Sequence, residues 1–144
     1  MKNNSCFTFT IYFILLTSIG LHTGCGGPKG QDIRDMTVAE ADSLYKANLD
    51  NSGFIILDVR TADEYNAVHI PEAINLDQNG NKFEDELEKL DRNNLYLVYC
   101  GDEQRSIEAL HSMERKGFIS AYRITGGILA WIMAGGTYER IKKE

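Results

Sequence analysis

Cysteine, proline and tryptophan are scarce in this chain of 144 residues, which contains three cysteines, two prolines and one tryptophan. Cys6 and Cys25 both lie in the N-terminal part, Cys6 directly before an apolar stretch and Cys25 shortly after it. Cys100 is therefore the single cysteine of the rest of the chain and has no partner there for a disulfide. A lone cysteine of this kind is either buried and inert or kept for chemistry.

Positive charge and metal-binding side chains are also sparse. The chain has 15 lysine and arginine residues against 21 acidic residues, a formal net charge of -6. Because no basic stripe is present to neutralise phosphates, the sequence argues against nucleic acid as a partner. The three histidines are dispersed and no cysteines are paired, so a metal site is unsupported and no cofactor is expected.

The one long apolar run lies near the N terminus, from about Phe7 to Leu21, and follows Lys2. This layout is typical of a secretory signal, and the run is too short and too interrupted by Thr and Ser to indicate a spanning helix. We therefore predict a signal peptide over residues 1–24. A Gly- and Pro-containing spacer is expected over residues 25–35.

Cys25 follows Gly24 at the expected cleavage point, and the segment resembles the signal of a bacterial lipoprotein, whose mature chain begins with a lipidated cysteine. The resemblance implies an exported protein, anchored by lipid on Cys25 to a bacterial membrane and facing the periplasm or the cell exterior. It departs from the usual pattern at His22, where such signals commonly have leucine. Two alternatives remain open, namely an uncleaved membrane-anchoring helix and a plain signal with an incidental cysteine.

From about Met36 onward, helical and strand patterns alternate. Thr37 and Thr61 each precede a helical pattern and are followed three residues later by glutamate, which predicts two capping boxes. Helices are expected over residues 37–48, 61–68, 81–90, 106–117 and 126–136, and strands over residues 53–60, 72–76, 94–100 and 121–125. This order predicts a single α/β domain over residues 36–144, with about five short parallel strands and helices on both faces.

Cys100 ends the apolar run "NLYLVYC", directly before a helical segment. Ligands of open parallel sheets bind at the carboxyl ends of strands, whereas a core cysteine is expected in mid-strand. Backbone N–H groups and the positive end of the next helix favour the thiolate, which is the reactive form of cysteine. Arg105 adds a fork of donors suited to an anionic substrate. The pattern predicts a nucleophilic sulfur that faces an anion-binding loop.

The folded part resembles the rhodanese family of sulfurtransferases. The resemblance rests on D-V-R, E-Y, H-I-P, C-x-x-x-x-R-S and G-G-x-x-A-W, which occur in that order in "ILDVRTADEYNAVHIPEAINL", "VYCGDEQRSIEAL", "KGF" and "ITGGILAWIMAGG". It implies that Cys100 takes a sulfane sulfur from a donor, as a persulfide, and passes it to a thiophilic acceptor such as cyanide, a thiol or an acceptor protein. The donor and the outer sulfur would be held by the loop residues Gly101, Asp102, Glu103, Gln104, Arg105 and Ser106.

Four residues separate Cys100 from Arg105. Related cysteine phosphatases have five in this interval, because their loop wraps a phosphate, and commonly carry histidine where this chain has Tyr99. The spacing therefore disfavours a phosphatase.

Two carboxylates, Asp102 and Glu103, distinguish this loop from those of efficient thiosulfate users. Negative charge beside the sulfur opposes both thiolate formation and anionic donors, so thiosulfate is expected to be a poor donor. Glu103 also stands where family loops usually have glycine; if that position requires a positive φ, glutamate costs about 1–2 kcal/mol. These features leave open a second interpretation, a weakly active module for binding or sulfur relay.

Several further polar residues have two interpretations each. Asp58 and Arg60 either organise the loop as second-layer residues or form, with Glu64, a structural ion-pair network between strand and helix. His69 is either a proton relay or a turn histidine with a satisfied hydrogen bond. His111 is expected to face solvent, and Trp131 to lie in the core.

Overall fold

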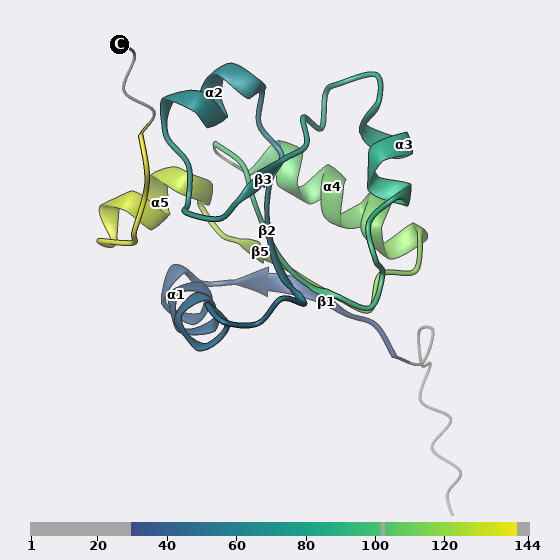
Figure 1. The fold of residues 1–144 in the computed structure, drawn as a ribbon, viewed down its shortest axis with the longest axis horizontal. Coiled ribbons are helices and arrows are strands. Elements are labelled where there is room, and N and C mark those ends of the chain that lie inside the picture. The colour runs from purple at the N-terminus through teal and green to yellow at the C-terminus, as the bar shows by residue number, and fades with distance from the viewer. Residues whose placement is uncertain (1–29, 102, 141–144) are drawn as a thin grey trace, which may run out of the picture.

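The computed structural model describes residues 30–101 and 103–140, and shows an α/β domain of alternating strands and helices (Figure 1). The expected signal peptide over residues 1–24, Cys25 and Asp102 lie outside the described residues. Within the described ranges, no helix combines the length and the apolar character that crossing a membrane requires. The elements are β1 (Asp32–Met36), α1 (Val38–Ala47), β2 (Phe54–Asp58), α2 (Ala62–Ala67), β3 (Ile74–Asn75), α3 (Phe83–Glu88), β4 (Leu95–Tyr99), α4 (Gln104–Arg115), β5 (Ser120–Ile124) and α5 (Gly127–Met133).

The five strands form one parallel sheet in the order β1-β5-β4-β2-β3. In the register of the central strands, Asp58 at the end of β2 pairs with Tyr99 at the end of β4, and Val98 pairs with Arg123 of β5. The carboxyl ends of these strands therefore lie along one edge of the sheet. This confirms the predicted fold class and places the segment after Tyr99 where parallel sheets bind ligands.

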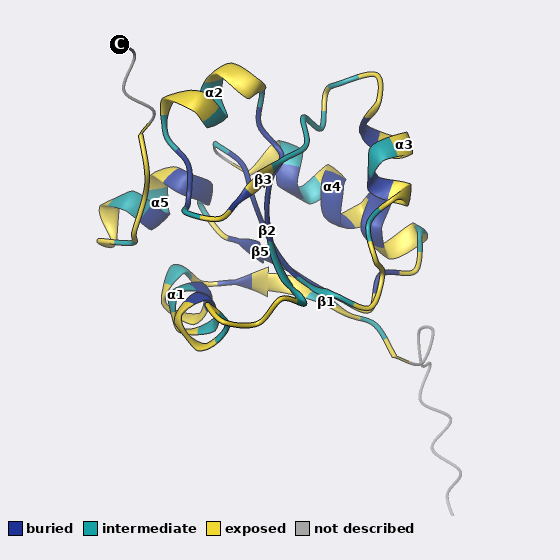
Figure 2. Ribbon diagram, viewed as in Figure 1, coloured by how far each residue is buried: buried dark blue, intermediate teal, exposed yellow. Residues whose placement is uncertain are grey.

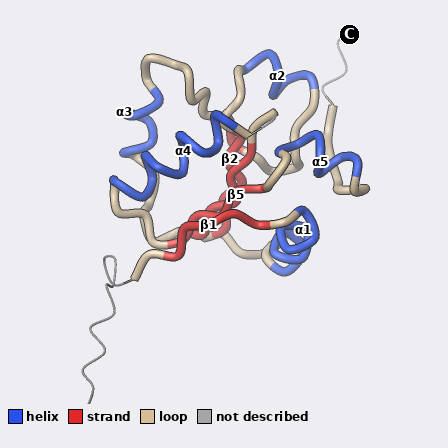
Figure 3. The backbone as a smooth tube through the Cα atoms, turned by 180° about the vertical axis from the view of Figure 1, so that it is seen from behind, coloured by secondary structure: helices blue, strands red, loops and turns tan. Residues whose placement is uncertain are grey.

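Helices cover both faces of the sheet, with α1 and α5 on one side and α3 and α4 on the other (Figures 1 and 3). On the first face, Tyr45 of α1 packs edge-on against Trp131 of α5, their ring centroids 5.6 Å apart. On the second, Tyr96 of β4 contacts Phe118 in the same way at 5.2 Å. The buried residues concentrate on the strands and on the inner helix faces (Figure 2). Trp131 is fully buried, as expected.

Both predicted capping boxes are present. The Thr37 hydroxyl accepts from the backbone N–H of Glu40, and the Glu40 carboxylate accepts from that of Thr37, which fixes the start of α1. Thr61 and Glu64 repeat the arrangement at α2. Because local side chains satisfy the free N–H groups of the first turn, these boundaries are readable from sequence.

The sequence-based boundaries are wrong at one place and inexact at others. Strand β1 lies mostly within the residues assigned to the spacer, and pairs with β5 from Asp32 to Met36. It was missed because an edge strand with the exposed and polar sequence "DIRDM" lacks an apolar run. Strand β3 keeps only Ile74–Asn75 of its expected length, and α4 begins two residues before the expected start.

Candidate active site

Cys100 follows the last residue of β4 and has no exposed surface. Its Sγ lies 3.3 Å from the Ser106 hydroxyl of α4, which itself donates to the carbonyl of Glu103 at 2.8 Å. Either atom can donate in this contact, and the bond from the hydroxyl to Glu103 favours the thiol as the donor.

The backbone around Cys100 is tied to two other elements. The N–H of Ile128, in the first turn of α5, donates to the Cys100 carbonyl at 2.9 Å, and the N–H of Val59 donates to the Tyr99 carbonyl at 3.0 Å. These bonds hold the end of β4 between the start of α5 and the end of β2. The backbone at Cys100 is thus held by the segments that follow β2 and β5 as well as by its own loop between β4 and α4.

Arg105, in the first turn of α4, forms a two-pronged ion pair with Glu64 of α2. Its two terminal nitrogens lie 2.6 and 2.8 Å from the carboxylate oxygens. The hydrogen bonds from Arg105, together with those from Thr61, outweigh burial and lower the pKa of Glu64 to about 2. The guanidinium predicted to bind an anionic substrate is therefore occupied, in this structure, by a carboxylate of the protein.

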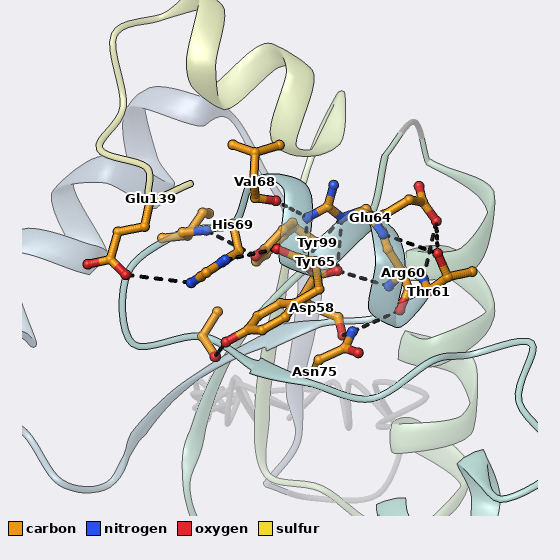
Figure 4. Close-up of polar contacts among 12 residues, drawn as sticks. Asp58, Arg60, Thr61, Glu64, Tyr65, Val68, His69, Asn75, Tyr99 and Glu139 are labelled. Carbon is orange, nitrogen blue, oxygen red and sulfur yellow. Dashed lines mark hydrogen bonds and ion pairs between the residues drawn. The ribbon is translucent and has the colours of Figure 1, made fainter. Parts of the chain in front are cut away.

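Asp58 and Arg60 form a second, fully enclosed pair (Figure 4). The Arg60 Nη2 donates to Asp58 Oδ2 at 2.6 Å and to the Val68 carbonyl, also at 2.6 Å. The side-chain amide of Asn75 donates to the backbone carbonyls of both Asp58 and Arg60. The pair therefore joins β2 to the end of α2 and to β3. This geometry favours the structural interpretation, although Glu64 pairs with Arg105 and not with Arg60.

Tyr99 and His69 lie beside this network (Figure 4). The Tyr99 hydroxyl accepts from the N–H of Ile70 at 3.1 Å, and burial, with the charge of Asp58, raises the pKa of the phenol. His69 stacks on Tyr65 and places Nδ1 2.9 Å from the Tyr65 carbonyl. Its Nε2 lies 3.5 Å from the Glu139 carboxylate. These contacts support the interpretation of His69 as a turn residue. His111 is exposed, as expected.

Glu103 connects the cysteine loop to the next strand-to-helix turn. Its carboxylate accepts from the N–H of Gly126 at 3.0 Å and lies 3.7 Å from Nη1 of Arg123. Its φ of -153° is not in the left-handed region, so the strain considered for a glutamate at this position does not arise. The charge of Glu103 is thus partly offset by Arg123, which the sequence analysis did not consider.

Arg123 is the main residue that the sequence analysis missed. It is 4% exposed, on β5, and binds Asp35 of β1 through two nitrogens. The available signal was an arginine inside the apolar strand "SAYRI", because a charge at an inward position requires a partner. Among the residues that the structure describes, no cluster of His, Cys, Asp or Glu is arranged to hold a metal ion.

Comparison with known proteins identifies the fold and the family. The rhodanese-like domain family matches residues 41–134. The chain is 32% identical over 77 residues to a thiosulfate sulfurtransferase GlpE of Coxiella burnetii. The aligned segment covers 54% of this chain and 70% of the relative. It is 34% identical over 76 residues to a probable adenylyltransferase/sulfurtransferase MoeZ of Mycobacterium tuberculosis, covering 53% of this chain but 19% of that longer protein.

The structural similarity covers more of the chain. The crystal structure of the Alr3790 protein from Anabaena sp. has a TM-score of 0.63 at 26% identity, covering 74% of this chain and 82% of that one. This similarity agrees with the α/β fold of the described residues. On the match over residues 41–134, the chain belongs to the rhodanese-like domain family.

Proposed function

We propose that this protein is a sulfurtransferase that carries a sulfane sulfur on Cys100. The observation that carries the proposal is the place of the thiol, at the carboxyl end of β4 and 3.3 Å from a hydroxyl of the following helix, within a chain of the rhodanese-like family. The similarity to sulfurtransferases supports the same reaction class.

The reaction consists of two displacements at sulfur. The Cys100 thiolate attacks the outer sulfur of a donor, either thiosulfate or a persulfide. A new S–S bond forms, the donor's S–S bond breaks, and its electron pair leaves with sulfite or with a thiolate. Cyanide or a thiolate then attacks the outer sulfur of the Cys100 persulfide, which restores the Cys100 thiolate. Electrons balance without an added oxidant or reductant, and no cofactor takes part.

In this scheme the residues around Cys100 hold and cover the sulfur. Ser106 donates a hydrogen bond to the thiolate after its hydroxyl rotates away from Glu103. Glu64 fixes Arg105 and thereby the first turn of α4, whose positive end favours an anion on the sulfur. Because Cys100 has no exposed surface, a donor must displace part of its covering before it reacts.

The complete burial of Cys100 also favours a second candidate, a rhodanese-like module that binds a partner or relays sulfur with little turnover of its own. The acidic residues Asp102 and Glu103 point in the same direction, since they oppose anionic donors. We accordingly expect thiosulfate to be a poorer donor than glutathione persulfide. High thiosulfate activity, unchanged in Asp102→Asn and Glu103→Gln, would contradict this expectation.

Intact mass spectrometry after treatment with each donor distinguishes the two candidates. A sulfurtransferase gains one sulfur atom, loses it on addition of cyanide or a thiol, and gains none as Cys100→Ser. Cys25→Ser is the matched control and should gain sulfur as the wild type does. If no donor adds a sulfur atom to the protein, the sulfurtransferase is rejected and the binding or relay module remains.

We also propose that the protein is exported and held at a bacterial membrane by lipid on Cys25, on the strength of the N-terminal sequence pattern. The physiological acceptor would then be met at the membrane surface.

A further inference from the structure

Arg123 is a buried cation whose hydrogen-bonding capacity is not fully used. Its Nε lies 2.7 Å from Asp35 Oδ1, and Nη2 binds the second oxygen of the same carboxylate. Its Nη1 is buried and has no hydrogen-bond partner among the described residues, although the Glu103 carboxylate lies 3.7 Å away. Buried polar groups are usually satisfied, so this nitrogen calls for an explanation.

The strand register places Arg123 beside the cysteine. Arg123 pairs with Val98 of β4, and Cys100 follows Val98 by two residues. Since side chains alternate along a strand, Val98 and Cys100 share the face of the sheet that α4 covers, and they pack in one cluster with Ala121 of β5. Arg123 follows Ala121 by two residues and therefore lies on that face as well.

The carboxylates near Arg123 are far more exposed to solvent than the guanidinium itself. The side chain of Arg123 is 5% exposed, whereas those of Asp35 and Glu103 are 58% and 48% exposed. Water screens exposed charges far more than buried ones, so the field inside the protein is dominated by the cation. The hydrogen bonds to Asp35, partly opposed by burial, raise the pKa of Arg123, and the charges of Asp35, Glu103 and Cys100 contribute in the same direction.

The other cations near the site are compensated more closely. Arg60 is enclosed with the equally buried Asp58, and Arg105 binds both oxygens of Glu64.

The surrounding helices add little further charge near the site. Helix α5 contributes no charged side chain between Gly127 and Met133, and Glu84 of α3 bonds to Ser112 and Lys116. The elements around Cys100 carry the following further charged or titratable groups, among the described residues: Tyr99, Glu103, His111 and Glu114.

We propose that Arg123 is a positioning residue for sulfur transfer, which stabilises the anionic sulfur on Cys100, both thiolate and persulfide, through its buried charge. Asp35 orients the guanidinium, and Glu103 reduces its effect. This inference deepens the proposed function, and it assigns to β5 the positive charge that the sequence pattern assigned to Arg105.

The pH profile of Cys100 alkylation tests the inference without any sulfur donor. The full chain is treated with iodoacetamide at a series of pH values, and modification is followed by mass on the peptide that contains Cys100. In Arg123→Gln the midpoint of the profile is expected to rise by about 0.5–1 pH unit. Arg123→Lys should restore most of the difference, because a cation remains.

Two further variants separate an electrostatic role from a structural one. Asp35→Asn removes the opposing charge, so its midpoint should shift downward, opposite to Arg123→Gln. Arg34→Gln is the matched control, since it removes one positive charge from a half-exposed side chain of the neighbouring strand β1 and should leave the midpoint unchanged.

The inference is overturned if Arg123→Gln, folded by circular dichroism, keeps the wild-type midpoint, or if Asp35→Asn shifts it upward. Should Arg123→Gln fail to fold, the direction of the Asp35→Asn shift decides. Failure of the sulfur-gain experiment would reject the proposed reaction but leave the alkylation midpoints measurable, so the two proposals fail separately.

Discussion

Replacing Glu64 by glutamine removes one negative charge from the contact that joins α2 to the first turn of α4. Glutamine has the same shape and keeps an oxygen for the Thr61 capping box, so the variant isolates the ion pair with Arg105. The pKa of Glu64 falls from 4.5 to about 2 on folding. At about 1.36 kcal/mol per pH unit, this corresponds to at most ~3.4 kcal/mol of stability.

The measurable effect is smaller because the side chain of Glu64 is 38% exposed and water screens the pair. We expect Glu64→Gln to lower the free energy of unfolding by about 1–2 kcal/mol at pH 7. Urea denaturation followed by the fluorescence of Trp131 measures this difference. Glu86→Gln is the matched control; it breaks an exposed pair with Lys89 and should cost at most about 0.5 kcal/mol.

The pH dependence provides the stricter test. Since the pKa of Glu64 is lower in the folded chain than in the unfolded chain, the ionised carboxylate stabilises the fold fully above pH 4.5, and this contribution is lost as the pH falls through about 2. The stability difference between wild type and Glu64→Gln should therefore narrow steadily between pH 5 and the acid limit of folding. A difference that is constant across this range, or below about 0.5 kcal/mol at pH 7, would refute the role assigned to the pair.

Three other changes have defined outcomes. Ser106→Ala should slow alkylation of Cys100 at pH 7 by about 3- to 10-fold, since the thiolate loses a hydrogen bond worth about 1 kcal/mol; an unchanged rate would exclude that role. Glu72, with a φ of 63°, is the one non-glycine residue with positive φ in the described ranges. Glu72→Gly should therefore raise the free energy of unfolding by up to about 1 kcal/mol, and a lower free energy of unfolding in urea denaturation would contradict this. Cys25→Ser should move the expressed protein out of the membrane fraction in cell fractionation; retention there would rule out the lipid anchor.

Local sequence signals predicted much of the fold. The two capping boxes at Thr37 and Thr61 involve residues three apart, so they were visible in the sequence and are present in the structure. The apolar runs of β2 and β4 were equally clear because both strands are central and covered on both faces. Strand β1 was not, since its stability comes from pairing with β5, nearly 90 residues away in the chain.

For the candidate site, the sequence predicted which residue carries the chemistry and where that residue lies in the fold. A single cysteine after an apolar run, with arginine five positions later, predicted a thiol at the carboxyl end of a strand, and Cys100 occupies that position. The motifs also predicted the family to which the chain belongs. These features are local, because they depend on spacing along the chain.

Only the tertiary structure decided how the charges are distributed around that thiol. It joined Arg105 to Glu64, 41 residues earlier, and Arg123 to Asp35, 88 residues earlier, and it buried the sulfur completely. The strength of a charge inside a protein depends on distance and on exposure to water, and neither can be read from a linear sequence. The candidate nucleophile could therefore be predicted from the residues alone, whereas the place of Arg123 on the same face of the sheet became visible only once β4 and β5 were paired.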